Sequence, residues 1–140
     1  MAAARALVID DNPINLELVV LLTEAAGFEV TAVTGAEEAL ECLRHSVPDL
    51  FLIDVQLPGM SGIDLLHLIR SRPDTARICA IIVTSYAMDS DKELAFSAGC
   101  NGYITKPIDT RTFGQQVRAV YEGSAPQNES AIEPKTGGGK

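Results

Sequence analysis

The sequence lacks an excess of positive charge: 19 aspartates and glutamates outnumber 11 lysines and arginines, which gives a formal net charge of −8. A surface of this sign repels phosphates, so the composition argues against nucleic acid as a partner. The sequence also lacks an apolar run of membrane-spanning length, and its opening, Met-Ala-Ala-Ala-Arg, contains no signal-peptide core. We therefore expect a soluble, cytoplasmic protein without a membrane partner.

Cysteine is scarce as well. The three cysteines, Cys42, Cys79 and Cys100, are odd in number and lack the spacing of a metal site. We expect reduced thiols that pack as small hydrophobic side chains, as is usual in the cytosol. Neither histidine, His45 or His67, has a set of ligands near it in the sequence, so both are interpreted as surface or hydrogen-bonded residues.

Strand and helix patterns alternate along the chain. Strands are predicted at about residues 5–10, 28–33, 50–54, 80–84 and 103–105, and helices at about 12–26, 36–44, 63–70, 90–98 and 110–121. This alternation predicts an α/β fold, a doubly wound parallel sheet of five strands with helices on both faces, over residues 1–122. Residues 123–140 are rich in Ser, Pro, Gly and Glu and contain one Ile, so they are predicted to be a disordered tail or linker.

Four of the predicted strands run into side chains that can bind or transfer charged groups. These side chains belong to Asp10, Asp11, Asp54, Thr84 and Lys106, the last of which precedes Pro107. Ligands of parallel α/β sheets bind beyond the carboxyl ends of the strands, so we expect these residues to form one site. Converging carboxylates repel one another unless a cation intervenes, and Mg²⁺ is the hard, oxygen-binding cation best suited to such a cluster.

The set and its order resemble the receiver domain of two-component response regulators, of the single-domain, chemotaxis-regulator-like type. The resemblance covers about Ala4 to Tyr121. It implies a flavodoxin-like (βα)₅ fold with strand order 2-1-3-4-5. It also implies a phosphorelay, in which a histidine kinase or histidine phosphotransfer protein transfers phosphate to Asp54 and the chain then signals through a downstream protein.

The resemblance assigns a role to each residue of the site. It implies that Asp11, Asp54 and the backbone carbonyl of Gln56 bind Mg²⁺, while Asp10 acts mainly through water. The phosphoryl group would contact Thr84 and Lys106, and Tyr103 would couple its rotamer to the Thr84 hydroxyl as a switch. The peptide bond before Pro107 would be cis, an isomer that is accessible only before proline.

Partner contacts are predicted on the first helix. Ile14, Asn15 and Leu18 are candidates for docking the phosphodonor, although this helix is apolar nearly all round and tight core packing explains it equally well. We expect a monomer or a weak phosphorylation-dependent dimer. We expect that the chain is not an enzyme that acts on a separate substrate, because it would catalyse only its own phosphorylation and dephosphorylation.

Other functions are less consistent with the residues. The domain could be a receiver cut from a hybrid histidine kinase. A Mg²⁺-dependent phosphatase of the haloacid-dehalogenase type also uses a strand-end Asp, but it needs a second Asp two residues later, where this chain has Gln56. A flavin-binding module of the same fold needs a Ser/Thr/Gly-rich phosphate loop where Asp10-Asp11-Asn12 stands.

Overall fold

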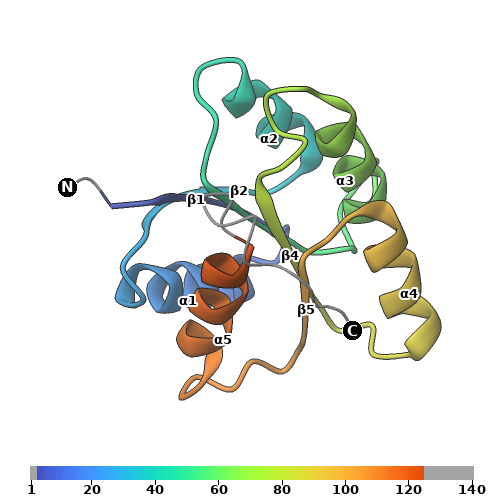
Figure 1. Ribbon diagram of the computed structural model, residues 1–140. Coiled ribbons are helices and arrows are strands. Elements are labelled where there is room, and N and C mark those ends of the chain that lie inside the picture. The colour runs from blue at the N-terminus through green and yellow to red at the C-terminus, as the bar shows by residue number, and fades with distance from the viewer. Residues whose placement is uncertain (1–2, 125–140) are drawn as a thin grey trace.

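The computed structural model describes residues 3–124 and contains one sheet of five parallel strands in the order β2-β1-β3-β4-β5. In chain order, the elements are β1 (Arg5–Ile9), α1 (Pro13–Ala25), β2 (Glu29–Val33), α2 (Ala36–Leu43), β3 (Leu50–Ile53), α3 (Gly62–Ser71), β4 (Cys79–Thr84), α4 (Asp89–Ala98), β5 (Gly102–Thr105) and α5 (Phe113–Gly123). Helices α1 and α5 cover one face of the sheet, and α2, α3 and α4 cover the other (Figure 1). The predicted flavodoxin-like α/β fold is confirmed, while residues 125–140 of the predicted tail lie outside the described residues.

The two faces of the sheet form two separate hydrophobic clusters. Because side chains of a strand alternate between faces, Ile53 of β3 packs under α2 and α3, whereas its neighbour Leu52 packs under α1 and α5. Every residue of β3 and β4 is buried, as expected for central strands covered on both sides. This burial holds the carboxyl ends of the strands in fixed relative positions.

The strand register aligns the ends of β1 and β3, while β4 continues two residues past them to Thr84. Ile9 pairs with Ile53, and Ile53 pairs with Ile82. The residue after each of the first two is an aspartate, and the Asp54 N–H donates a hydrogen bond to the Ile9 carbonyl at 3.0 Å. Asp10 and Asp54 therefore leave the sheet side by side.

The helix boundaries follow local capping chemistry. Asn12 rather than Asp11 caps α1, because its Oδ1 accepts hydrogen bonds from the N–H groups of Ile14 (3.0 Å) and Asn15 (3.1 Å). Most predicted boundaries agree closely with those observed. None of the helices within residues 3–124 is long and apolar enough to cross a membrane.

The boundaries of α5 differ from the prediction. The helix begins at Phe113 instead of Thr110, because Asp109 organises a separate turn: its Oδ1 accepts the Arg111 N–H and its carbonyl accepts the Phe113 N–H, each at 2.9 Å. At the other end, the helix extends to Gly123, two residues beyond the predicted end at 121.

Candidate functional site

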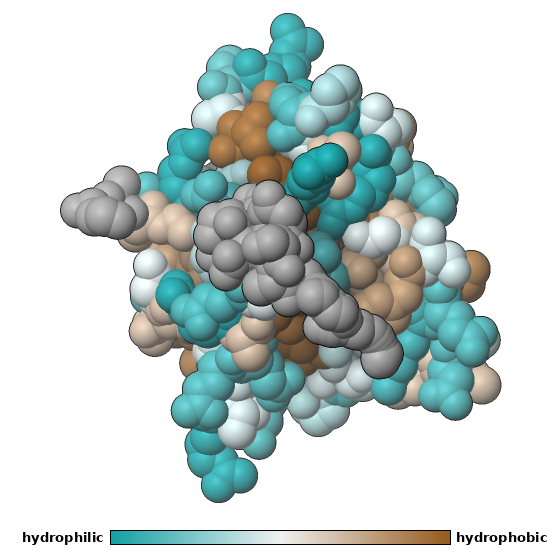
Figure 2. Space-filling model, viewed as in Figure 1, coloured by the Kyte–Doolittle hydropathy of each residue, from teal (hydrophilic) through white to brown (hydrophobic). Residues whose placement is uncertain are grey.

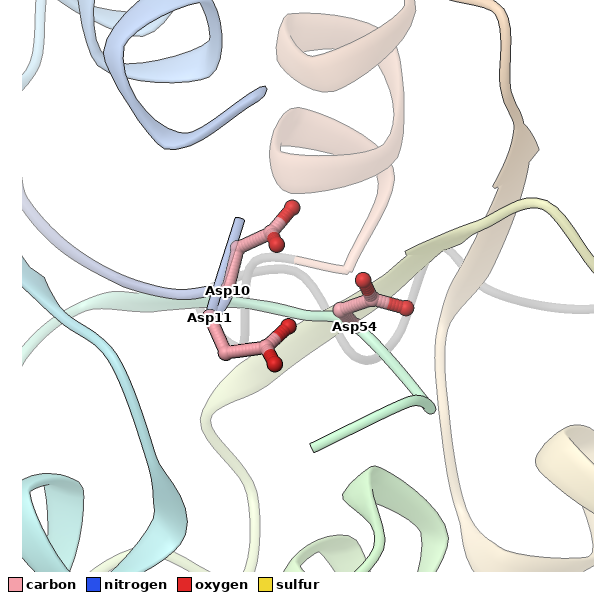
Figure 3. A group of neighbouring side chains, drawn as sticks. All are labelled: Asp10, Asp11 and Asp54. Atoms are coloured by element: carbon pink, nitrogen blue, oxygen red, sulfur yellow. The ribbon is translucent and has the colours of Figure 1, made fainter. Parts of the chain in front are cut away.

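Three carboxylates meet at the carboxyl end of the sheet. Asp10 and Asp11 follow β1 and Asp54 follows β3, and each contributes an oxygen to a group whose members lie within 4.8 Å of one another (Figure 3). Asp10 and Asp54 are buried, whereas Asp11 is exposed. The structure thus brings together the three acids that were predicted to cluster.

A single ammonium group bridges the two buried acids. Lys106 Nζ donates hydrogen bonds to Oδ2 of Asp10 at 2.9 Å and to Oδ2 of Asp54 at 3.0 Å, and the Lys106 side chain is only 9% exposed. Burial lowers the pKa of Lys106, but its hydrogen bonds to Asp10 and Asp54 and their negative charges outweigh burial and raise the pKa above its usual value. One ammonium therefore faces three carboxyl groups.

The buried acids are also held by backbone groups. Oδ1 of Asp10 accepts the N–H of Asn12 at 2.9 Å, and Oδ1 of Asp54 accepts the N–H of Gln56 at 3.1 Å. Both oxygens of each buried acid are thus engaged, and the positions of these side chains are fixed. Within residues 3–124, none of the hydrogen bonds involves the Asp11 carboxylate, so Asp11 is the acid with oxygens to spare.

The donor set fits a hard divalent cation. Every candidate ligand is an oxygen, and an excess of carboxyl groups over ammonium groups favours added positive charge. In the loop after Asp54, the Val55 carbonyl accepts the N–H groups of Leu57 (3.1 Å) and Gly62 (2.9 Å). In the described part of the chain, no hydrogen bond uses the neighbouring Gln56 carbonyl, which leaves its lone pairs for a ligand.

Thr84 and Lys106 are neighbours at the ends of β4 and β5. The Lys106 N–H donates to the Thr84 carbonyl at 2.8 Å, and Thr84 is fully buried. The Thr84 hydroxyl accepts the Tyr86 N–H at 3.4 Å. The Lys106–Pro107 peptide bond is cis. The same edge of the sheet therefore carries the predicted hydroxyl, the ammonium and the acids.

Tyr103 connects β5 to the loop that follows Thr84. It pairs with Ile82 and packs against the cluster under α2, α3 and α4, while its hydroxyl donates to the Tyr86 carbonyl at 2.8 Å. Burial raises the pKa of Tyr103, and the charge of Asp91 raises it further. The switch role of Tyr103 stays a prediction, but its contact with this loop gives that role a physical route.

The predicted docking residues on α1 differ in exposure. Ile14 is 77% exposed, which rules out core packing for this residue, while Asn15 and Leu18 are half-buried. The sequence reasoning missed Leu21, which is 58% exposed. Ile14, Leu18 and Leu21 recur at helical spacing, a signal that could have identified the stripe.

Two glycines in the segment after Asp54 serve different purposes. Gly59 serves turn geometry, because its φ is +74° and open space surrounds it. A Cβ on Gly62, however, would overlap the backbone carbonyl of Asp54 and lie 2.9 Å from Cγ2 of Ile53. Gly62 therefore permits α3 to pack against the strand end that carries Asp54.

Comparisons with known proteins agree with this geometry. The chain matches the family model of the response regulator receiver domain over residues 6–118. It is 35% identical over 119 residues to the polar-differentiation response regulator DivK of Brucella ovis, covering 85% of this chain and 96% of DivK.

Two solved structures extend the comparison. A putative response regulator from Chloroflexus aurantiacus superposes with a TM-score of 0.82 at 30% identity, covering 86% of this chain and 99% of that chain. The receiver domain of sensor histidine kinase PA1611 from Pseudomonas aeruginosa, with magnesium coordinated in its active-site cleft, superposes with a TM-score of 0.77 at 26% identity, over 86% and 99% of the two chains.

These findings do not favour the alternatives of a phosphatase or a flavin module. Receiver domains interact with histidine kinases and with downstream targets in two-component signalling. In this chain, the acidic residues cluster where the family is phosphorylated. The chain belongs to the response regulator receiver domain family.

Proposed function

We propose that this receiver accepts a phosphoryl group on Asp54 from the phosphohistidine of a histidine kinase or a histidine phosphotransfer protein. One observation carries the proposal: the buried Asp54 carboxylate lies beside two further acids and accepts a hydrogen bond from Lys106 at 3.0 Å. A nucleophilic carboxylate next to a fixed ammonium is suited to phosphoryl transfer, where positioning and charge stabilisation dominate catalysis.

Asp11, Asp54 and the Gln56 carbonyl are the groups we infer to hold Mg²⁺. The exposure of Asp11 and the absence of a hydrogen bond to it within the described residues support a direct ligand there. Asp10, which accepts hydrogen bonds from the Asn12 N–H and from Lys106, would contact the ion through water. When bound, the ion supplies positive charge to the oxygens of the transferring phosphoryl group.

The residues of the chain carry the transfer itself. A carboxylate oxygen of Asp54 bonds to phosphorus as the phosphorus–nitrogen bond to the donor histidine breaks, and the electron pair returns to the imidazole. The Lys106 ammonium binds the phosphoryl oxygens and stabilises their negative charge, and the Thr84 hydroxyl donates a hydrogen bond to one of them. Water later cleaves the aspartyl phosphate, so the chain acts catalytically only on itself.

We infer that signalling proceeds through protein contacts. The exposed stripe on α1 supports docking of the phosphodonor, and the contact between Tyr103 and Tyr86 supports a downstream target on the α4–β5–α5 side. We propose that the chain is a monomer or a weak phosphorylation-dependent dimer. A cytoplasmic location is consistent with its free cysteines, two of which are buried.

Acetyl phosphate tests the assignment. Intact-mass measurement after incubation with acetyl phosphate and Mg²⁺ should show one added phosphate on the wild-type chain. Asp54→Asn should remove this adduct, whereas the control Asp64→Asn, an exposed acid in the first turn of α3, should retain it. Chelation of the metal should prevent labelling without a change in circular dichroism. A phosphate adduct that persists in Asp54→Asn contradicts the proposal.

A further inference from the structure

Helix α4 is attached to the domain at one end only. No residue from 85 to 94 is buried, and within the helix only Ala95 and Ala98, near its carboxyl end, are buried. Leu94 is 62% exposed and Phe96 is 50% exposed. Hydrophobic and hydrophilic residues are interspersed on the surface over α4, at the right-hand side of the molecule in Figure 2. The amino-terminal half of α4 therefore has little apolar burial to hold it in place.

The carboxyl end of α4, in contrast, is fastened to α3 by Arg70. Arg70 Nε donates to the Gly99 carbonyl at 2.9 Å, and Nη2 donates to Oδ1 of Asn101 at 3.0 Å. Its third contact, from Nη1 to the Thr75 carbonyl at 3.1 Å, ties the guanidinium to a fully buried residue whose own hydroxyl donates to the Ile69 carbonyl. One side chain thus joins the end of α3 to the segment that follows α4.

Asn101 extends this connection to β4. Oδ1 of Asn101 accepts the Ala80 N–H at 2.8 Å, and the Asn101 N–H donates to the Ala80 carbonyl at 2.7 Å. Gly99 has a φ of +110°, and a Cβ there would lie 3.0 Å from Cγ and Nε of Arg70. The glycine both ends α4 and admits the arginine, so residues 99–101 form a rigid junction with α3 and β4.

We propose that α4 is a lever that pivots about its fixed end, the junction at Gly99–Asn101, which we call the hinge, and that Arg70 is the positioning residue that holds this end in place. Local opening requires little free energy where few apolar groups are buried, and hinges occupy a few residues at the end of an element. The free end of the lever joins the loop containing Tyr86, which hydrogen-bonds to both Thr84 and Tyr103. Only the trigger of the movement, phosphorylation, rests on the proposed function; the hinge itself does not.

Amide hydrogen exchange of the full, unphosphorylated chain tests the hinge. Helices α3 and α4 have the same length, ten residues each, so equivalent positions can be compared without the bias of unpaired N–H groups in the first turn. We expect the amides of residues 93 and 94 in α4 to exchange about tenfold or more faster than those of residues 66 and 67 in α3. Equal protection at these positions overturns the lever.

Variants of Arg70 test the clamp. In Arg70→Met, the amides of residues 99–101 should exchange about tenfold faster than in the wild type. The control is Arg72→Met, which removes an arginine paired with Asp74 and should leave these exchange rates unchanged. If Arg70→Met fails to fold, Asn101→Ala is the second variant: it removes the hydrogen bond from Arg70 and the one from the Ala80 N–H, and it should give the same loss. Unchanged protection in the folded variant overturns the role of Arg70.

Addition of beryllofluoride and Mg²⁺ then distinguishes a failure of the hinge proposal from a failure of the proposed function. In the wild type, the chemical-shift changes of this region should concentrate in residues 85–94 and spare residues 99–101. In Arg70→Met, the changes should extend into 99–101. Changes of equal size along all of α4 in the wild type overturn the hinge. A complete absence of response would contradict the phosphorylation site instead, while the exchange pattern of the unliganded chain would still decide the hinge.

Discussion

Gly62 lies directly against the backbone carbonyl of Asp54, at a separation that leaves no room for a Cβ atom. The first residue of α3 is thereby pressed onto the strand end that carries the candidate phosphoacceptor. The position of the Asp54 carboxylate thus depends on a residue eight positions later that has no side chain to contribute.

Replacement of this glycine should disturb both stability and phosphorylation. Gly62→Ala must displace α3 or the end of β3, and overpacking of this kind costs about 1–3 kcal/mol. Urea unfolding should show this loss, and labelling by acetyl phosphate should slow. Gly123→Ala is the control, because a Cβ at Gly123 meets open space. Full stability and normal labelling in Gly62→Ala would refute the close packing.

Removal of the bridging ammonium of Lys106 should destabilise the fold more than replacement of Gly62. Lys106→Met leaves Asp10 and Asp54 buried without their cation, and the loss of one partner of a buried ion pair typically costs about 3–5 kcal/mol. Millimolar Mg²⁺ should raise the melting temperature of Lys106→Met more than that of the wild type, since a divalent cation restores the missing charge. Lys92→Met, on the surface of α4, should behave like the wild type. A variant as stable as the wild type would contradict the bridge.

Stability should fall in the alkaline range because of Cys100. Burial raises the pKa of this thiol from 9.0 to about 11, so the folded chain keeps a proton that the unfolded chain releases. The stabilisation is complete below pH 9 and is lost as the pH rises toward 11. Urea unfolding across this range should show a smaller loss in Cys100→Ala than in the wild type, whereas Cys42→Ala should retain the wild-type loss. Equal losses in wild type and Cys100→Ala would contradict this assignment.

Tyr103 should report phosphorylation of the site. Its hydroxyl already contacts the Tyr86 carbonyl, so a movement of the Thr84 hydroxyl toward a phosphoryl group changes the surroundings of its ring. The NMR signals of Tyr103 should shift on addition of beryllofluoride and Mg²⁺, and the shift should shrink in Thr84→Ala. Tyr121, which packs on Phe28, serves as the control ring. An undiminished shift in Thr84→Ala would break the proposed coupling.

The α1 stripe should matter for protein donors and not for small ones. Ile14→Ala and Leu18→Ala should slow phosphotransfer from a cognate kinase by about tenfold, equivalent to about 1.4 kcal/mol. Their labelling by acetyl phosphate should remain at the wild-type rate. Leu94→Ala, an exposed leucine on α4, is the matched control. Unchanged kinase rates in both variants would exclude docking through these residues.

Much of the fold and of the site followed from the sequence. The buried strands read as apolar runs of four to six residues, and strands covered on both faces must lack polar side chains until they leave the sheet. Asp10 and Asp54 directly follow such runs, and Thr84 ends one. Their positions therefore predicted that the three side chains lie together at one edge of the sheet. Local signals of the same kind mark two helix ends: the side chain of Asn12 caps α1, and Gly99, in the left-handed conformation, ends α4.

Other features depended on tertiary structure, because they arise from residues distant in the chain. An apolar α1 does not say which leucines face solvent; packing of that helix against α5 and the sheet decides it. The pairing of Lys106 with both Asp10 and Asp54, across 96 and 52 residues, has no local signature. Gly62 and Arg70 likewise acquire their roles from a carbonyl and a glycine that only folding brings beside them. Hydrophobic periodicity determines which elements form. Contact between the elements decides which charged side chains pair and where only a glycine fits.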